Sequence, residues 1–295
     1  MVRDNGSKFD RPLVGLALSG GVARGLAHIG VLKVLEEHGI PVDYIAGTSA
    51  GAIVAGAYAA GMPMDEICEV GRSLRWRDVG RVTLSRLGVQ SNARLEEFTR
   101  SRLPVKRFEE ARIPLAIIAT DLKTGSAVII SEGDIAFAIR ASCALPGWYV
   151  PVTDEHGRQL VDGGLVANIP TSAVRSLGAD IVIAVDVNSE GAKFIGPPHS
   201  VIGVLLQSIM VVQRTAAVHQ LHDADVVIAP RTGHIRWDEM GRADELIALG
   251  EQAALSTVER IRHLIQPVQQ PPLRWYQRRR QQPQPEDKRR VSPLK

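Results

Sequence analysis

Short apolar runs of strand length alternate with stretches of helical periodicity along most of this chain, and this alternation constrains the fold more than any other feature. Strand-like residues 13–18 precede helix-like residues 26–37, and the order repeats at residues 42–46 and 50–60. Such repeats form βαβ units, so the sequence predicts an α/β fold with a parallel sheet. Further strands are expected at 114–120, 127–131, 181–187 and 226–229, and further helices at 135–142, 171–177, 201–221 and 243–263.

The chain is expected to contain one folded domain, because residues 12–265 hold no composition break typical of a linker. Residues 1–11 are predicted to be a flexible N-terminus. Residues 266–295 are rich in Pro, Gln and Arg, so we expect a disordered tail. Residues 72–103 carry many Arg residues and weak apolar periodicity, and we interpret them as a cap over a site.

Charge is concentrated in the tail. Its eight Lys or Arg residues face only Glu286 and Asp287, so it carries +6, whereas the whole chain carries a formal +3 and the rest therefore −3. With Trp275 and Tyr276, these charges suit contact with an anionic membrane. Nucleic acid would attract the tail through the same charges, but we expect no dedicated nucleic-acid partner. A solvated extension without any partner is the alternative.

Compartment and cofactor use follow from a few further features. Cys68 and Cys143 lack the spacing of a disulfide framework or a zinc site. Residues 1–10 contain no apolar core of a signal peptide, and the apolar stretches at 50–60 and 201–212 are too short to span a bilayer. We therefore expect a cytoplasmic protein, soluble or peripheral at the inner membrane face, without metal or cofactor.

A serine stands between two glycines in Gly47-Thr48-Ser49-Ala50-Gly51. The pattern follows a predicted strand and opens a predicted helix, which is the setting of a nucleophile elbow. In such a sharp turn, side chains at 47 and 51 would collide with nearby backbone, and the helix N-terminus favours a developing oxyanion. This setting, more than the GxSxG pattern alone, predicts that Ser49 is a nucleophile.

A glycine-rich loop follows the first predicted strand. It reads Ser19-Gly20-Gly21-Val22-Ala23-Arg24-Gly25, and its backbone N–H groups can converge on an anion. A dinucleotide fingerprint is the competing interpretation, but Val22 breaks the G-x-G-x-x-G spacing. We therefore favour an oxyanion hole at Gly20, Gly21 and Val22.

The third motif is Asp162-Gly163-Gly164, which comes after an apolar-rich turn expected at residues 159–161. A carboxylate beside two glycines can point into a pocket, where partial burial would raise its pKa and make it a better base toward a serine hydroxyl. An ordinary Asp-Gly turn is the alternative.

Together these motifs resemble the patatin-like phospholipases of the compact bacterial type. The resemblance covers roughly residues 12–265 and excludes the tail. It rests on the loop residues Gly20, Gly21, Arg24 and Gly25, the GTSAG elbow with Gly47 and Gly51, the DGG motif with Gly163 and Gly164, and the stretches LAHIGVL at 26–32 and AIRASCALPG at 138–147. Several motifs in the same order are far more specific than any one of them.

The resemblance implies a three-layer α/β/α fold and a serine esterase acting on lipids, of the phospholipase A or lysophospholipase type. It assigns Ser49 as nucleophile, Asp162 as general base, and the backbone at Gly20, Gly21 and Val22 as oxyanion hole. Arg24 would neutralise a phosphate or fix the loop. Val22 departs from the family pattern, in which a small residue is common, and its β-branched side chain would narrow the acyl entrance or restrict the backbone.

Two alternatives remain open. One of the eight histidines could complete a Ser, Asp, His triad of the α/β-hydrolase kind. The chain could instead be a low-turnover regulatory or membrane-binding module on the same fold. The cluster His219, His222, Asp223 and Asp225 matches no metal motif, and we interpret it as a polar helix end. Asp186 is assigned no catalytic role.

Overall fold

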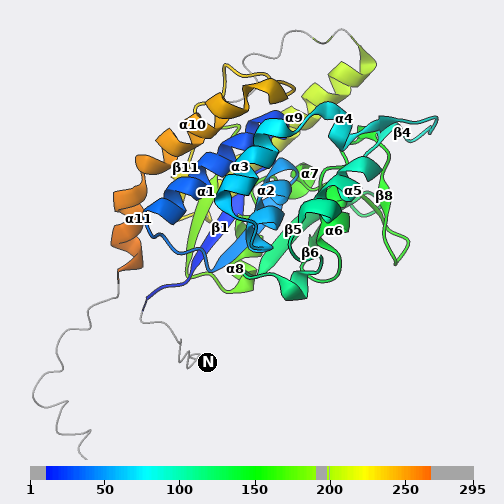
Figure 1. Cartoon of the computed structure of the whole chain (residues 1–295). Helices are drawn as coiled ribbons and strands as arrows, with labels where there is room; N and C mark the ends of the chain where they lie inside the picture. The colour runs from blue at the N-terminus through cyan, green and yellow to red at the C-terminus, as the bar shows by residue number, and fades with distance from the viewer. Residues whose placement is uncertain (1–10, 191–197, 199, 267–295) are drawn as a thin grey trace, which may run out of the picture.

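The computed structural model describes residues 11–190, 198 and 200–266 (Figure 1). The expected flexible N-terminus and basic tail lie almost wholly outside the described residues, so the tail's contact with membrane stays a prediction. His199 also lies outside the described residues.

An eight-stranded sheet forms the centre of the molecule, in the order β11-β10-β1-β2-β5-β9-β8 with β6 also paired to β5. The parallel part consists of β1 (Val14–Leu18), β2 (Tyr44–Thr48), β5 (Leu115–Asp121), β10 (Ile181–Val185) and β11 (Val226–Ile228). The antiparallel strands are β6 (Ala127–Ile130), β8 (Val152–Thr153) and β9 (Gln159–Asp162). The mainly parallel central sheet is therefore confirmed.

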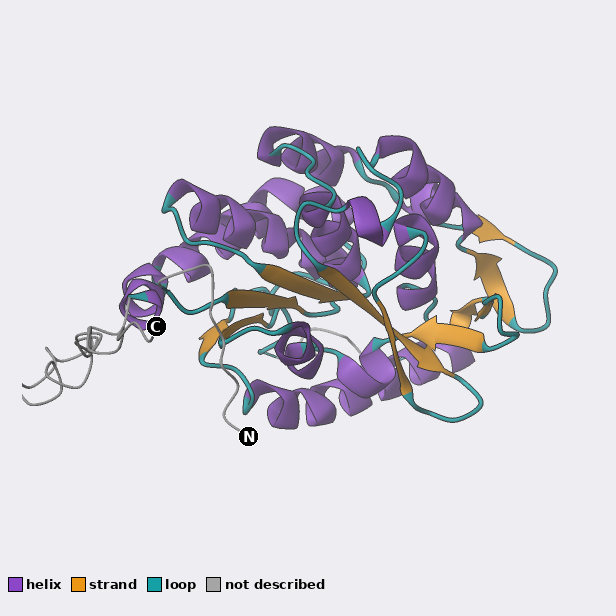
Figure 2. Cartoon of the chain, turned by 90° about the horizontal axis from the view of Figure 1, so that it is seen from below, coloured by secondary structure: helices purple, strands orange, loops and turns teal. Residues whose placement is uncertain are grey.

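Helices cover both faces of this twisted sheet (Figure 2), because its strands are apolar on both sides. In β10, Ile183 and Val185 pack into one buried cluster, whereas Val182 and Ala184 pack into another. The first cluster includes residues of α1 (Ala27–Glu37), α2 (Ala50–Ala59), α3 (Met64–Ser73), α6 (Ile135–Ser142), α10 (Ala243–Leu255) and α11 (Val258–Ile265). The second includes residues of α8 (Thr171–Leu177) and α9 (Val201–Leu221). Short α7 (Gly164–Ala167) packs against α9. The predicted three-layer α/β/α fold is confirmed.

Residues 72–103 are more regular than expected. They include the end of α3, then α4 (Trp76–Val79), β3 (Arg81–Val82), β4 (Gly88–Ser91) and α5 (Ala93–Arg102). Strand β4 pairs with β7 (Gly147–Tyr149) in a separate small sheet. Short 3-10 turns complete the description at η1 (Val22–Leu26), η2 (Phe108–Glu110) and η3 (Met240–Arg242).

Two expected elements were wrong. Residues 159–161 do not form a turn but belong to β9, because their backbone pairs with both β5 and β8. The single helix expected at 243–263 is divided into α10 and α11. At the break, Ser256 Oγ donates to Ala253 O at 2.7 Å and Thr257 Oγ1 to Ala254 O at 2.8 Å. Such local side-chain hydrogen bonds compete with helix continuation.

Helix α9 is unusual in its exposure. The apolar stretch noted at 201–212 is part of this 21-residue helix, which by length and composition could cross a membrane. Only 11% of its most apolar window is buried in the structure. Length and composition alone do not distinguish a span from a surface helix, because other apolar helices pass the same test.

Candidate active site

Ser49 lies at the turn between β2 and α2 with φ 53° and ψ −120°. A non-glycine residue rarely adopts this backbone conformation, which costs about 1–3 kcal/mol and is found mainly at functional sites. The flanking glycines allow the close packing that the turn needs. A Cβ at Gly51 would lie 2.3 Å from Leu18 O, and one at Gly47 would lie 2.5 Å from Gly51 O. These contacts support the expected elbow geometry.

Ser142, at the end of α6, holds the backbone of Ser49 in place. Its Oγ accepts the Ser49 N–H at 2.7 Å and donates to Ile118 O of β5 at 2.6 Å. Ser142 is fully buried, so both partners are protected from water. This residue lies in the stretch at 138–147 that carried the resemblance, but sequence reasoning gave it no role.

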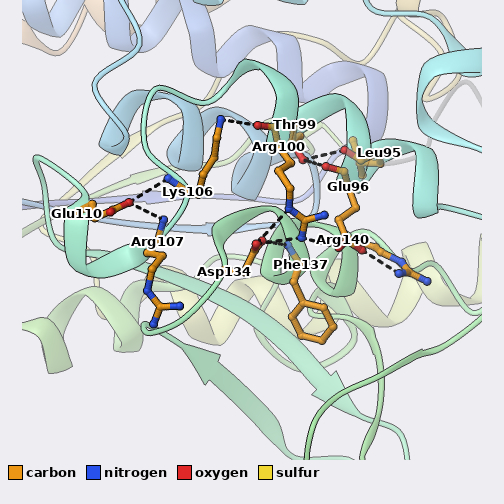
Figure 3. A network of polar contacts seen from close by, with 10 residues as sticks. All are labelled: Leu95, Glu96, Thr99, Arg100, Lys106, Arg107, Glu110, Asp134, Phe137 and Arg140. Atoms are coloured by element: carbon orange, nitrogen blue, oxygen red, sulfur yellow. Dashed lines mark hydrogen bonds and ion pairs between the residues drawn. The ribbon is translucent and has the colours of Figure 1, made fainter.

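A network of ion pairs anchors α6 itself (Figure 3). Glu96 of α5 accepts from Arg140 of α6 at 2.8 Å and from Arg100 at 2.6 Å. Arg100 also donates to Asp134 at 2.9 Å, and Asp134 caps α6 by accepting the Phe137 N–H at 2.8 Å. Since Ser142 ends the same helix, this network helps to fix the support of Ser49.

Asp162 is the carboxylate next to Ser49, and it is fully buried at the end of β9. Its Oδ1 accepts the Gly164 N–H at 2.8 Å, whereas Oδ2 is buried without a hydrogen bond of standard geometry. Burial raises the pKa of Asp162 to about 6, against the opposing effects of the Ser49 side chain and the Gly164 N–H. The carboxylate is thus poised between its charged and neutral forms near neutral pH.

The glycines after Asp162 bring this segment close to its neighbours. A Cβ at Gly163 would lie 2.2 Å from Ile118 O, and one at Gly164 would lie 2.9 Å from Asp162 Oδ1. Thr48 Oγ1 donates to Ala167 O at 2.8 Å, so the residues after the DGG motif are tied to the elbow.

The glycine-rich loop contributes N–H groups beside Ser49. A Cβ at Gly20 would lie 3.2 Å from Ser49 Cβ, which shows how close the loop approaches. The Gly20 N–H donates to Asn168 O at 3.1 Å. Within the described part of the chain, the N–H groups of Gly21 and Val22 have no acceptor. Two of the three predicted oxyanion donors are therefore free to bind an anion. Val22 has φ 51°, so its backbone is strained like that of Ser49.

Arg24 is buried and fixes the loop. Its Nε donates to Ile235 O at 2.8 Å and its Nη1 to Asn188 Oδ1 at 3.3 Å, whereas Nη2 has no partner among the described residues. Asn188 Nδ2 in turn donates to Gly20 O at 2.9 Å. Burial lowers the pKa of Arg24. A Cβ at Gly25 would lie 2.4 Å from Ala50 Cβ, so this glycine lets the loop pack on α2.

Two small pockets contain Ser49. One, of about 80 Å³, is mostly apolar and is lined by residues that include Leu74, Trp76, Val79, Leu95 and Tyr149. The predicted cap segment therefore lines it, as does Tyr149, whereas Trp148 does not. The other, of about 30 Å³, lies between the glycine loop and α9. A larger cavity of about 690 Å³ lies beyond Asn188, Met210 and Gln213 and does not include Ser49.

None of the histidines that the structure describes lines either of these two Ser49 pockets. His28 is buried, bonds through Nε2 to Ser19 O at 2.8 Å, and has its pKa lowered to about 4 by burial. It therefore supports the loop backbone in its neutral form. His219 and His222 form a ring contact, and no group of metal-binding side chains occurs among the described residues.

Sequence reasoning missed further residues around Ser49. The Cys143 thiol lies next to the Ser49 side chain, and burial raises its pKa. Asn168 and Asn188 bind the glycine loop from distant parts of the chain. No local pattern marks the two asparagines, because their role depends on contacts between elements far apart in the sequence.

Comparison with known families and proteins gives one family match. A family model described as "Patatin-like phospholipase" matches residues 16–175. An uncharacterized NTE family protein of Mycobacterium tuberculosis is 38% identical over 184 residues, covering 61% of this chain and 51% of that protein. A lysophospholipase nte1 of Emericella nidulans is 35% identical over 187 residues, covering 60% of this chain and 12% of that protein. The chain thus spans about half the length, or less, of these curated relatives.

Two solved structures share the fold. VipD from Legionella pneumophila has a TM-score of 0.52 and 14% sequence identity, covering 85% of this chain and 67% of that chain. The type III effector protein ExoU has a TM-score of 0.50 and 17% identity, covering 85% and 53%. At these identities the similarity concerns the fold alone.

Proposed function

This chain belongs to the patatin-like phospholipase family, and we propose that it hydrolyses carboxylic esters of lipids with Ser49 as nucleophile and Asp162 as general base. The observation that carries the proposal is a serine at φ 53° beside a fully buried carboxyl group whose pKa is raised to about 6. Acyl transfer by a serine needs a well-positioned nucleophile in contact with a base whose pKa lies near the working pH.

The first step is attack on the ester carbonyl. Asp162 accepts the Ser49 hydroxyl proton while Oγ forms a bond to the carbonyl carbon, giving a tetrahedral oxyanion. Asp162 Oδ2 suits this role because no other group among the described residues competes for it. Hydrogen bonds of this kind often tighten only when substrate is bound.

The oxyanion is stabilised by backbone donors. The N–H groups of Gly21 and Val22 have no acceptor in the described part of the chain, which supports them as the oxyanion hole. Gly20, whose N–H is already bonded to Asn168, serves to bring the loop close to Ser49. Arg24 acts as a positioning residue for the same loop.

Turnover needs two proton transfers back from Asp162. Collapse of the first intermediate expels the alcohol, which takes the proton from Asp162, and leaves an acyl-enzyme on Ser49. Asp162 then removes a proton from water, which attacks the acyl carbonyl, and finally returns that proton to Ser49 as the acid leaves. The chain's own residues suffice for each step.

The apolar pocket favours a fatty acyl group. Its lining includes residues of η1, α2, the cap segment and β7, and contains mainly aliphatic and aromatic side chains. The lysophospholipase name of a relative is consistent with an ester of this class. We therefore propose an activity of the phospholipase A or lysophospholipase type.

The test is hydrolysis of p-nitrophenyl esters from short to long acyl chains, together with fluorophosphonate labelling. We expect Ser49→Ala and Asp162→Asn each to reduce kcat by roughly a thousandfold or more. Asp121→Asn is a matched control, because Asp121 is also buried, at 8% exposure, but bonds within the β5–β6 turn. Full activity in Ser49→Ala would contradict the proposal.

A second candidate function is favoured by one observation, the strained β-branched Val22 between the two Ser49 pockets. It could restrict turnover and leave a regulatory module on the same fold. Labelling separates the candidates, since a module without an activated nucleophile should resist the fluorophosphonate even when well folded.

A further inference from the structure

We propose that the outer face of α9 and the tip of the β3–β4 hairpin form one docking surface for an anionic lipid membrane. The outer face of α9 consists of Val201, Val204, Leu205, Val211, Val212 and Val218, which are 44–81% exposed. The hairpin, residues 81–91, adds Val82, Leu84, Leu87 and Val89, which are 38–103% exposed. The choice of a lipid partner rests on the proposed function.

The exposed residues of α9 lie on one side of the helix. Their spacing of three, four and seven residues places the apolar ones in a single stripe, which also carries the exposed polar residues Ser208, Arg214, Thr215 and His219. The opposite side packs inward, where Leu206, Ile209 and Met210 line a Ser49 pocket. Because α9 is apolar on both sides, its outer side also needs an apolar environment to cover it.

The two parts of the surface are close in space. Strand β4 pairs with β7 through Gly88 and Gly147, and α9 packs against the same β7. An added Cβ at the exposed Gly147 would touch Leu205 at 4.0 Å. The hairpin and the N-terminal half of α9 also lie toward the same end of the molecule in Figure 1.

Charge favours an anionic lipid surface over other partners. The hairpin contains Arg81 and Arg86 and no acidic residue, and the one Asp, Glu, Lys or Arg residue of α9 is Arg214. Cations flanking aliphatic side chains suit insertion between anionic headgroups. Protein interfaces are typically enriched in aromatic anchors, and none occurs among these apolar side chains.

The position of the surface fits interfacial hydrolysis. Helix α9 separates it from Ser49, because its inner side is a wall of the pocket and its outer side is the docking stripe. The surface therefore places the pocket near the membrane.

The test compares matched variants of the full chain. Val204→Glu, Val212→Glu and the control Leu255→Glu each replace an apolar side chain that is 52% exposed, but Leu255 lies on α10 over the other sheet face. Binding is measured by sedimentation with vesicles of equal parts phosphatidylcholine and phosphatidylglycerol, at low and high salt. We expect each α9 variant, and Leu84→Glu, to weaken partitioning roughly tenfold, and Leu255→Glu to leave it unchanged.

High salt distinguishes this surface from attraction by basic residues alone, because aliphatic insertion persists when charges are screened. Binding that disappears in high salt, or that the α9 variants leave intact, would overturn the proposal. So would a lipid-free dimer that Val204→Glu dissociates, since the surface would then bind a second copy.

Hydrolysis of soluble p-nitrophenyl butyrate keeps the two proposals apart. We expect the α9 variants to retain this activity and to lose about tenfold of their hydrolysis of vesicle lipid. If the wild type hydrolyses neither ester, the proposed function fails, while sedimentation still decides whether the surface binds membrane.

Discussion

Ser49 and Val22 are the two non-glycine residues with a positive φ among the described residues, and both border the same pockets. Their φ angles are nearly equal, at 53° and 51°. Their surroundings differ. The Ser49 N–H is held by Ser142 and its turn is enclosed by glycines packed on backbone, whereas the Val22 N–H has no acceptor in the described part of the chain.

The difference indicates that the same backbone strain has a different role at each residue. At Ser49 the backbone is held by the Ser142 hydrogen bond and by the close packing of the flanking glycines, which in the proposed mechanism directs the side chain at the substrate. At Val22, in the same proposal, the strained backbone presents the N–H to the oxyanion, and the side chain is not needed for that role. Substitutions around Ser49 should therefore cost much more than a substitution of Val22 itself.

The largest expected effect comes from breaking the packing at the elbow. Gly51→Ala would place a Cβ 2.3 Å from Leu18 O and 2.6 Å from Ser19 O, both of them backbone atoms. We expect a loss of about 3 kcal/mol or more in the free energy of unfolding, measured by urea denaturation. Gly56→Ala is the control on the same helix, because its Cβ would meet side-chain atoms and not backbone, with Ile139 Cδ1 at 2.8 Å and Ile135 Cγ2 at 3.3 Å. Its effect should stay within about 1 kcal/mol.

The next largest effect is expected at Asp162, where a substitution should raise the free energy of unfolding instead of lowering it. Its pKa is raised from 3.8 to about 6 in the folded protein, so the native state binds more protons than the unfolded state between these values. Stability is therefore lost as pH rises through this window, by roughly 3 kcal/mol. Asp162→Asn should raise the free energy of unfolding at pH 7 by a similar amount while hydrolysis is lost.

The pH dependence of the free energy of unfolding provides a control for the raised pKa of Asp162. The pKa of His28 is lowered from 6.5 to about 4, so its contribution to stability is lost as pH falls through that range, opposite to Asp162. In the wild type the two slopes partly cancel. Asp162→Asn should therefore be more acid-sensitive than wild type between about pH 6 and 4. Equal acid sensitivity in both proteins would contradict the raised pKa of Asp162.

Much of this architecture could be predicted from the sequence, and the elements that were missed have a physical reason. The strand and helix alternation was sufficient for the parallel part of the sheet, because β1, β5 and β10 are buried along their whole length and β2 and β11 are mostly buried. Strand β9 was missed because its short apolar run precedes a DGG motif typical of a turn, and only pairing with β5 and β8 makes it a strand.

The candidate site divides in the same way. Ser49 and Asp162 stand in local motifs, so the sequence singled them out, and the structure places them side by side. Ser142 supports Ser49, and Asn168 and Asn188 support the glycine-rich loop, through hydrogen bonds between distant elements. A single sequence contains no local signal for such contacts.

Ser142→Ala tests how far the strain at Ser49 depends on its hydrogen bond. The change leaves a buried N–H without an acceptor, which should cost about 2 kcal/mol in the free energy of unfolding. A looser elbow should also lower kcat roughly tenfold to a hundredfold, with little change in KM. Ser256→Ala is the control, because it removes an exposed side-chain hydrogen bond to Ala253 O. An unchanged kcat would show that packing alone positions Ser49.

Val22→Gly should have the smallest effect on stability. Glycine relieves the strain of a β-branched residue at φ 51°, but it also gains freedom in the unfolded chain and loses apolar contacts. These contributions oppose one another, so the free energy of unfolding should change by less than about 1 kcal/mol. The N–H donor remains, and because Val22 lines both Ser49 pockets, we expect removal of its side chain to widen the space between them. We therefore expect hydrolysis of long-chain p-nitrophenyl esters to rise a few-fold relative to short-chain esters, because the acyl entrance widens. A loss of activity on all esters would mean instead that the Val22 side chain holds the loop in its oxyanion-binding conformation. Activity would then depend on the side chains of both strained residues, Val22 and Ser49.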